Sequence, residues 1–167
     1  LSAITTIDGT NILSVTIDTT PFTISTIPDM TTGTDKGISD SDDITNIRAP
    51  SFTMTGLPAS AEIIQLYVDG VLSAAETKTA DVTTHTFALG SDLDEGTYDI
   101  TFIIVDAAGN ASAASNALSI TIDFTAPSTP STVDLADSDD TGVSDSDNLT
   151  RRASMGITAS GLDEGDY

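Results

Sequence analysis

The chain has 167 residues and a formal net charge of −21 at pH 7, which excludes nucleic-acid binding because phosphate groups would repel it. No apolar stretch reaches the roughly 18 residues that a membrane span needs, so membrane insertion is not expected. Cysteine is absent and histidine occurs once, which excludes disulfides, thiolate metal sites and most nucleophile–base pairs, so we expect a non-enzymatic protein with no small-molecule substrate.

Apolar and polar residues alternate along several short segments, which predicts β-strands with one buried face. The segment 63–68 ends in Asp69-Gly70, a two-residue hairpin signal. About six or seven short strands in about 100 residues predict an all-β fold of the sandwich type. In chain order, the expected strands lie at 23–27 (a weak edge strand before Pro28), around Phe52 and Met54, at 63–68, around Phe87 and Leu89, at 97–106, and along Leu118, Ile120 and Ile122.

The pentapeptide Asp94-Glu95-Gly96-Thr97-Tyr98 stands at the start of the most apolar of these segments. In immunoglobulin-like sandwiches a tyrosine at this place turns its hydroxyl group back onto the preceding corner, so that the ring is buried and its polar tip is satisfied. The sequence therefore predicts an immunoglobulin-like β-sandwich.

Two segments recur at a constant distance of 105 residues. GISDSDDIT at 37–45 returns as GVSDSDNLT at 142–150, and LSVTID at 13–18 returns as LSITID at 118–123. A fixed period of this length indicates a tandem repeat of whole domains. We expect residues 1–17 to be the C-terminal strand of a preceding repeat, 18–123 a complete repeat, and 124–167 the N-terminal part of the following one.

The recurring segments carry crowded aspartates, which indicate a cation site. Carboxylates placed this close repel one another unless a cation is present, and a flexible set of oxygen ligands suits calcium better than magnesium. The alternative is that these segments are solvated turns whose charge serves solubility. The candidate ligands are Asp35, Asp40 and Asp42 in the first copy and Asp140, Asp145 and Asp147 in the second.

Two further groups of oxygen ligands lie near the ends of the complete repeat. Asp106 and Asn110 flank a turn after the tyrosine-bearing strand, although an ordinary Asn-capped turn would explain them as well. Asp18 and its counterpart Asp123 each follow a closing strand. The sandwich topology predicts that Asp106 and Asn110 lie near Asp18 and that the first acidic loop lies near Asp123, so that calcium would lock the joints between repeats.

The segments 67–70, 106–112, 121–127 and 140–148 resemble the bacterial immunoglobulin-like repeats of giant RTX adhesins. In that family such domains form long tandem arrays, bind calcium around the linkers and extend a ligand-binding tip away from a Gram-negative cell. The resemblance implies metal roles for Asp18, Asp35, Asp40, Asp42, Asp106, Asp123, Asp140, Asp145 and Asp147. Lys36, which replaces the Thr141 of the second copy, places a positive charge beside Asp35 and makes that ligand the least secure.

We therefore expect a structural extender domain of a calcium-dependent adhesin on the bacterial cell surface, outside the cell. Its partners would be the neighbouring repeats of the same chain. Two alternatives remain open: an adhesive module that binds carbohydrate or protein on a host or biofilm surface, and an accessory domain of a secreted glycosidase. An adhesive module would need an exposed aromatic platform, for which Tyr67 and Tyr98 are the candidates.

Overall fold

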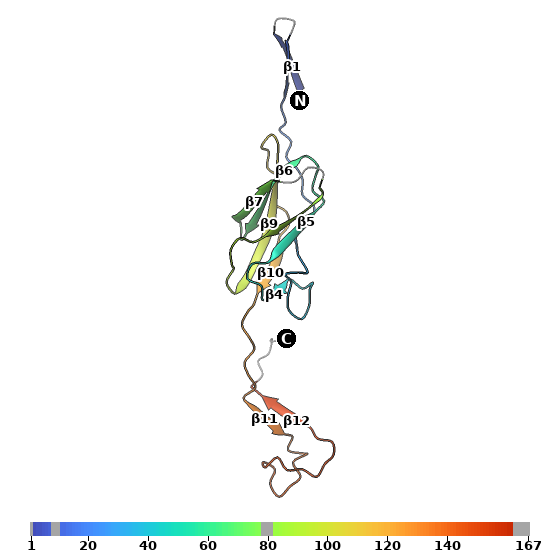
Figure 1. The fold of residues 1–167 in the computed structure, drawn as a ribbon, viewed down its shortest axis with the longest axis vertical. Helices are drawn as coiled ribbons and strands as arrows, with labels where there is room; N and C mark the ends of the chain where they lie inside the picture. The colour runs from blue at the N-terminus through green and yellow to red at the C-terminus, as the bar shows by residue number, and fades with distance from the viewer. Residues whose placement is uncertain (1, 8–10, 78–81, 162–167) are drawn as a thin grey trace. The chain divides into compact units, whose positions relative to one another are not determined.

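The computed structural model describes residues 2–7, 11–77 and 82–161 of the chain. Its regular structure there consists of strands, and no helix in this part is long and apolar enough to cross a membrane. The chain divides into two units, Leu1–Phe124 and Thr125–Tyr167 (Figure 1). Residues 162–167, which the repeat assigns to the following domain, lie outside the described residues.

The first unit begins with an antiparallel hairpin of β1 (Ser2–Ile7) and β2 (Asn11–Thr16). A sandwich of two sheets follows. Its strands are β3 (Asp29–Met30), β4 (Ile44–Thr45), β5 (Ser51–Thr55), β6 (Ala61–Val68), β7 (Val71–Thr77), β8 (Thr84–Ala88), β9 (Gly96–Asp106) and β10 (Leu118–Ile122).

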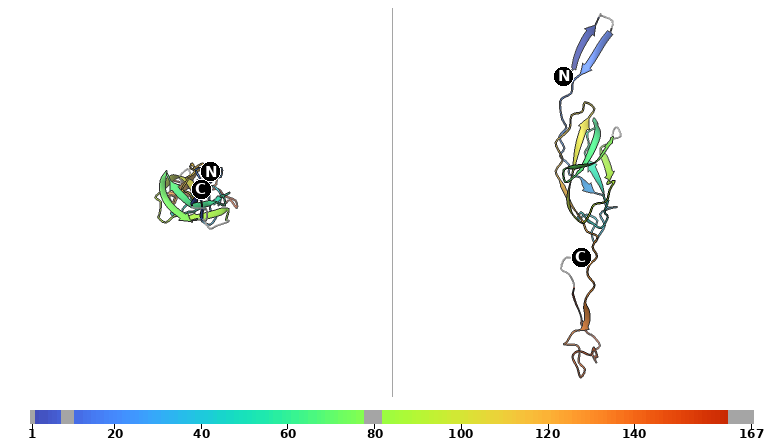
Figure 2. Two further views of the ribbon diagram at one scale, coloured as in Figure 1. Left: turned by 90° about the horizontal axis from the view of Figure 1, so that it is seen from above. Right: turned by 90° about the vertical axis from the view of Figure 1, so that its left-hand side faces the viewer.

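One sheet of the sandwich has the order β4-β10-β9-β6-β7 and the other the order β3-β5-β8. Neighbouring strands are antiparallel, except that β4 and β10 are parallel. Figure 2 shows the same sandwich from two further directions. The two-sheet sandwich predicted from the alternating pattern is confirmed.

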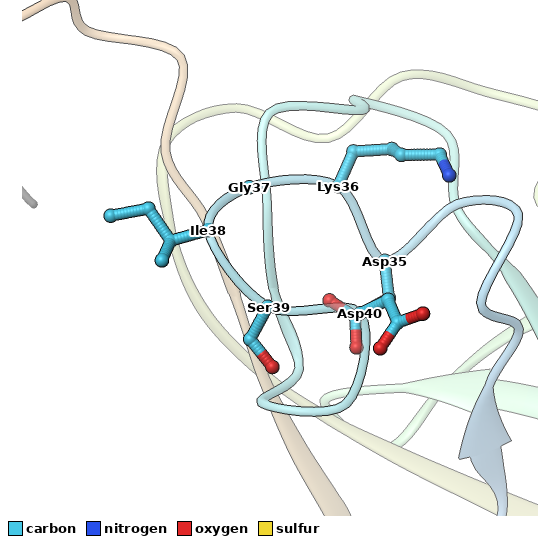
Figure 3. Close-up of a pocket in the computed structure, with 6 residues that line it drawn as sticks. All are labelled: Asp35, Lys36, Gly37, Ile38, Ser39 and Asp40. Atoms are coloured by element: carbon cyan, nitrogen blue, oxygen red, sulfur yellow. The ribbon is translucent and has the colours of Figure 1, made fainter.

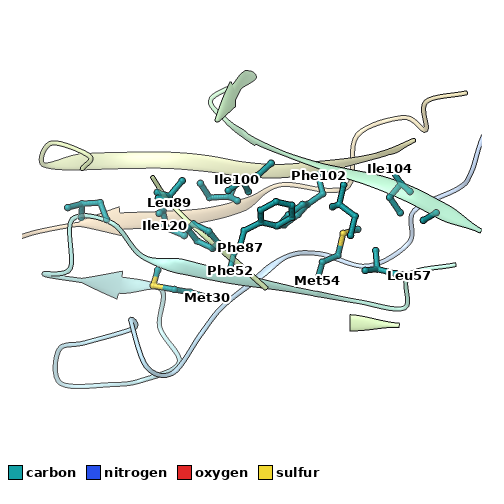
Figure 4. Close-up of a cluster of buried hydrophobic side chains, with 14 residues drawn as sticks. Met30, Phe52, Met54, Leu57, Phe87, Leu89, Ile100, Phe102, Ile104 and Ile120 are labelled. Atoms are coloured by element: carbon teal, nitrogen blue, oxygen red, sulfur yellow. The ribbon is translucent and has the colours of Figure 1, made fainter. Parts of the chain in front are cut away.

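The core lies between the two sheets and consists of alternate residues of their strands (Figure 4). Phe52, Phe87 and Phe102 are 0% exposed, and the ring centroids of Phe87 and Phe102 lie 5.3 Å apart. Ile64 and Leu66 of β6 are equally buried. Because full burial of one such side chain contributes about 2 kcal/mol, this apolar layer is the main source of the unit's stability.

Local sequence signals predicted the central strands and their turns correctly. The segment 97–106 lies within β9, and 63–68 lies within β6. Asp69 and Gly70 have φ of 49° and 75°, the positive values that a type I′ hairpin turn requires. The hydroxyl group of Tyr98 donates to the carbonyl of Asp94 at 3.1 Å, so the predicted tyrosine corner is confirmed.

The edge strand predicted at 23–27 is wrong. This segment lies along β5 but is held by a side chain, because the hydroxyl group of Thr26 donates to the carbonyl of Thr55 at 3.0 Å. Pro28 has no N–H group to donate, so it cannot contribute a donor to a sheet ladder. Regular pairing begins only after it, where Met30 stands opposite Phe52.

Two serines take the place of a strand beside the C-terminal half of β9, which extends beyond β10. The N–H groups of Phe102 and Ile104 donate to the hydroxyl oxygens of Ser115 and Ser112, at 3.0 Å in both cases. The backbone N–H groups of the two serines donate in return to the carbonyls of Phe102 and Ile104, at 2.9 Å in both cases. Both serines are buried, so they satisfy backbone groups that water does not reach.

In the described part of the second unit, β11 (Thr132–Leu135) and β12 (Ile157–Ser160) form an antiparallel pair. Leu135 stands opposite Ile157, and each lies 105 residues after its counterpart in the Met30–Phe52 pair of β3 and β5. The register of the first unit therefore recurs in the second. The repeat boundaries expected at residues 18 and 123 remain a prediction.

Candidate cation-binding loops

The first acidic loop connects β3 to β4 and contains a buried carboxylate at Asp35, which is 1% exposed (Figure 3). The N–H group of Asp35 donates to the carbonyl of Thr31 at 2.9 Å, and its Oδ2 accepts the N–H group of Asp43 at 3.3 Å. Its Oδ1 is buried and has no hydrogen-bond partner among the described residues. Since an unsatisfied buried charged group costs more than the roughly 1–3 kcal/mol of a neutral one, this oxygen needs a ligand.

The second acidic loop repeats this arrangement around Asp140, which is 7% exposed. The N–H group of Asp140 donates to the carbonyl of Ala136 at 3.1 Å, and its Oδ2 accepts the N–H group of Asn148 at 3.1 Å. Its Oδ1 is again buried without a partner in the described part of the chain. Two loops with different neighbouring side chains thus leave the same carboxylate oxygen unsatisfied, which indicates that the common pattern determines it.

The other predicted ligands of both loops lie on the surface. Asp42 accepts the N–H group of Ile44 at 3.2 Å, and Asp147 accepts that of Leu149 at 3.1 Å, so each closes a turn with its own backbone. No group of three acidic or histidine side chains within the described residues forms a ready-made metal centre. The exposed carboxylates are Asp40, Asp42, Asp145 and Asp147.

Lys36 stands beside Asp35 in sequence but directs its charge elsewhere. Its ammonium group donates to the carbonyl of Thr32 at 3.1 Å on the exposed side of the loop. Figure 3 shows its side chain running in a different direction from that of Asp35. Because water and salt screen an exposed ammonium group strongly, Lys36 would repel a cation at Asp35 only weakly.

Asp43 is half-buried at the end of the first loop, and other negatively charged side chains lie near it. Burial, followed by the negative charges of Asp35, Asp29 and Asp42, raises the pKa of Asp43 above its ordinary value. A hydrogen bond from the N–H group of Met30 offsets part of this shift. The surroundings of Asp43 therefore disfavour its ionised form more than water does.

At the C-terminal end of β9, Asp106 and Asn110 meet Asp18 as predicted. The carboxylate of Asp106 accepts the N–H groups of Ala108 and Asn110, at 2.9 and 2.8 Å, and the side-chain amide of Asn110 at 2.9 Å. These hydrogen bonds lower the pKa of Asp106, and the bond from the side-chain amide of Asn110 contributes most to the shift. The same amide donates to the carbonyl of Asp18 at 3.0 Å. Asp106 is thus already satisfied by its own turn, unlike Asp35.

Asp123 lies at the other end of β9, beside the strand that ends the first loop. Its N–H group donates to the carbonyl of Thr45 at 2.9 Å, and the N–H group of Thr121 donates to the carbonyl of Asp43 at 2.8 Å. The backbone of the first acidic loop and that of Asp123 are therefore neighbours, as the sequence predicted.

Arg48 holds the start of the segment that follows β10. Its guanidinium group forms ion pairs with Asp92 and Asp94, both at 3.1 Å, and lies over the ring of Phe124 at 5.1 Å from the centroid. The N–H group of Phe124 donates to the side chain of Glu95 at 3.3 Å. Sequence reasoning missed this group, because its members come from three distant segments.

Sequence reasoning also missed the role of residues 43 and 148. The repeat aligned them, but the hydrogen bond that Leu135 donates to the side chain of Asn148, at 2.9 Å, depends on the fold. Their positive φ values, 60° and 58°, were foreshadowed only by the residue types, since Asp and Asn tolerate this conformation better than other side chains.

The chemistry of the loops fits calcium better than the other common metals. Their side-chain donors are carboxylate, hydroxyl and carbonyl oxygens, which hard cations prefer, and the protein has no cysteine. The buried Oδ1 atoms of Asp35 and Asp140 accept no hydrogen bond from the described residues, so each can accept a cation or another donor. Since three carboxylates do not converge in the described residues, a calcium ion would also need backbone or hydroxyl oxygens of the loop.

Comparison with known proteins identifies one family. A family model described as a bacterial Ig-like domain matches residues 21–124, which include the complete sandwich, the first acidic loop and the Arg48 group. No curated protein matches the chain.

Proposed function

Because the chain belongs to the bacterial Ig-like domain family, we propose that it is a structural extender, or stalk, domain of a calcium-dependent bacterial cell-surface adhesin. Domains of this family are structural or surface-associated modules, are in general non-catalytic and are often exposed at the cell surface. The proposal adds two specific points to this membership: a spacer role in a tandem array and a calcium requirement.

The positions of the two chain connections carry the spacer role. The chain joins the sandwich at Asp18, which contacts Asn110 just beyond the C-terminal end of β9. It leaves at Phe124, which contacts Glu95 just before the N-terminal end of β9. β9 has 11 residues, so at about 3.3 Å per residue the two connections stand about 35 Å apart. A domain with its connections at opposite ends adds its full length to a chain of repeats.

The unsatisfied oxygens of Asp35 and Asp140 support the calcium requirement. A bound ion would supply the positive charge that these buried carboxylates need and would draw together loops that otherwise repel. The ion would thereby stiffen the array at its joints. The residues that would hold calcium are Asp35, Asp40, Asp42 and Asp123 at one end of the repeat, Asp18, Asp106 and Asn110 at the other, and Asp140, Asp145 and Asp147 in the next copy.

Thermal unfolding of the full chain in calcium and in chelator tests the proposal, with magnesium as the control ion. A ligand that binds only the native state at 100 times its Kd stabilises it by about 2.7 kcal/mol, so calcium should raise the Tm by several degrees. Small-angle scattering of the same samples should show a longer and stiffer particle in calcium. The double variant Asp35→Asn, Asp140→Asn should lose most of both responses.

If calcium changed neither the Tm nor the particle length, the calcium requirement would be refuted. The acidic loops would then be interpreted as solvated turns. A rise in Tm that the double variant retains in full would place the ion elsewhere in the chain.

A further inference from the structure

A glycine occurs at the same place in both acidic loops, at Gly37 and Gly142, two residues after the buried aspartate of each. Neither glycine has a positive φ, the conformation that most often makes glycine necessary in a loop. The sign of φ therefore does not explain why both loops lack a side chain here. What glycine provides at these positions is the space that a Cβ atom would fill.

The space beside Gly142 is surrounded by oxygen atoms. A Cβ atom there would lie 3.1 Å from the carbonyl oxygen of Leu149, 3.3 Å from Oδ1 of Asp147 and 3.6 Å from the carbonyl oxygen of Ser144. Among the described residues, no backbone N–H group donates to either of these carbonyls. Two carbonyl oxygens and one carboxylate oxygen thus converge on one point, and oxygens of these kinds are the ligands that calcium prefers.

A wider form of the same geometry surrounds Gly37. A Cβ atom there would lie 3.5 Å from the carbonyl oxygen of Ile44, the counterpart of Leu149. The pairing of β4 with β10 uses the carbonyls of Asp43 and Thr45. Because successive carbonyls of a strand point in opposite directions, the carbonyl of the intervening Ile44 is directed toward the glycine instead.

The glycine of the first loop shares a cavity with the buried aspartate. Gly37 and Asp35 both line this cavity, together with Ser39 and Asp40 (Figure 3). Oδ1 of Asp35 accepts no hydrogen bond from the described residues, and the same holds for Oδ1 of Asp140 in the second loop. An oxygen-lined space and an unpartnered buried carboxylate oxygen are separate observations, and both fit a cation bound inside these loops.

We infer that Gly37 and Gly142 keep open the position of a calcium ion in their loops. Its main-chain ligands would be the carbonyl oxygens of Ile44 and Leu149, which face these glycines. The inference rests on the proposed function, that calcium binds at these loops. Calcium lies about 2.3–2.6 Å from its oxygen ligands, so an ion bound on the glycine side of either carbonyl would overlap a methyl group 3.1–3.5 Å from that oxygen.

A calcium titration of the full chain tests this inference, with the backbone amide signals of Asp40 and Asp145 followed by NMR as reporters of the two loops. Gly37→Ala should raise the calcium midpoint of the first loop about ten-fold or more, because the methyl group removes a main-chain ligand. Gly142→Ala should do the same in the second loop. Each variant should leave the midpoint of the other loop within about two-fold.

Gly33→Ala is the matched control for the first loop. It adds the same methyl group at a glycine that also lacks a positive φ, but the new Cβ atom would meet nothing within 4 Å. The calcium midpoint should therefore stay within about two-fold of the natural one. In chelator, Gly37→Ala should keep the Tm of the natural protein or raise it slightly, since its Cβ atom makes an ordinary van der Waals contact.

An unchanged midpoint in Gly37→Ala would overturn the inference and leave calcium binding intact. A loss in Gly33→Ala as large as that in Gly37→Ala would also overturn it, because any methyl group in the loop would then have the same effect. A lower Tm of Gly37→Ala in chelator would count equally against it, since the fold and not the ion would then need the glycine. If neither amide signal of the natural protein responds to calcium, the inference fails together with the proposed function.

Discussion

Replacing Ser115 or Ser112 with alanine tests whether two side chains stabilise the sandwich in place of a strand. Each hydroxyl accepts a buried backbone N–H group of β9 at 3.0 Å and donates to a nearby carbonyl, at 2.9 Å to Asn116 and at 2.7 Å to Ala113. Alanine keeps the Cβ and removes only the oxygen. The backbone donor of β9 is then left without a partner in the interior.

The cost of such an orphaned donor is about 1–3 kcal/mol, so we expect each variant to lose about 2 kcal/mol of unfolding free energy. For a domain of about 100 residues this corresponds to a fall in Tm of about 10 °C. Urea unfolding gives the free energy directly, and hydrogen exchange of the amides of Phe102 and Ile104 shows whether the loss is local. Ser119→Ala, on the exposed side of β10, is the matched control and should change stability by less than about 0.5 kcal/mol. A Ser115→Ala variant as stable as this control, with the amide of Phe102 still protected, would refute the reasoning.

Two further changes test the ends of the sandwich. Asp106 has a lowered pKa, so its carboxylate stabilises the folded state above the ordinary value of about 4 and this contribution is lost as the pH falls through the lowered pKa. The stability difference between the natural protein and Asp106→Asn, measured by urea unfolding, should therefore shrink from pH 7 to pH 3, and a constant difference would contradict it. Arg48→Ala should cost about 1 kcal/mol through the loss of two exposed ion pairs and the contact with Phe124. Because salt screens exposed pairs, this cost should fall in about 1 M sodium chloride, and a cost independent of salt would assign it to packing alone.

The sequence predicted best those features that depend on neighbours along the chain. The alternation of apolar and polar residues places Ile100, Phe102 and Ile104 on one face of a strand. This pattern does not depend on the rest of the fold, so β9 could be predicted from the sequence. The Tyr98 corner and the Asp69-Gly70 turn are equally local. The 105-residue repeat then directed attention to the acidic loops, because an internal copy shows which positions are retained.

The features that the sequence could not reveal depend on distant segments. No local pattern marks Ser112 and Ser115, because their role arises only where β9 extends beyond the end of β10. The sequence made Asp35 the least secure ligand of the first loop because of Lys36, yet the fold buries Asp35 and leaves Asp40 and Asp42 on the surface. Which carboxylate lacks a partner is a property of the folded loop, and spacing alone does not contain it.

The parallel pairing of β4 and β10 determines how the domain would respond to mechanical tension. A pull on the chain at Phe124 draws β10 lengthwise, across the two hydrogen bonds that Thr121 and Asp123 donate to the carbonyls of Asp43 and Thr45. When the pull runs along the strands, such hydrogen bonds share the force and must break together. When two strands are pulled apart from one end, their hydrogen bonds break one after another. Since Asp43 also ends the first acidic loop, the contact that bears force first lies directly at the end of that loop.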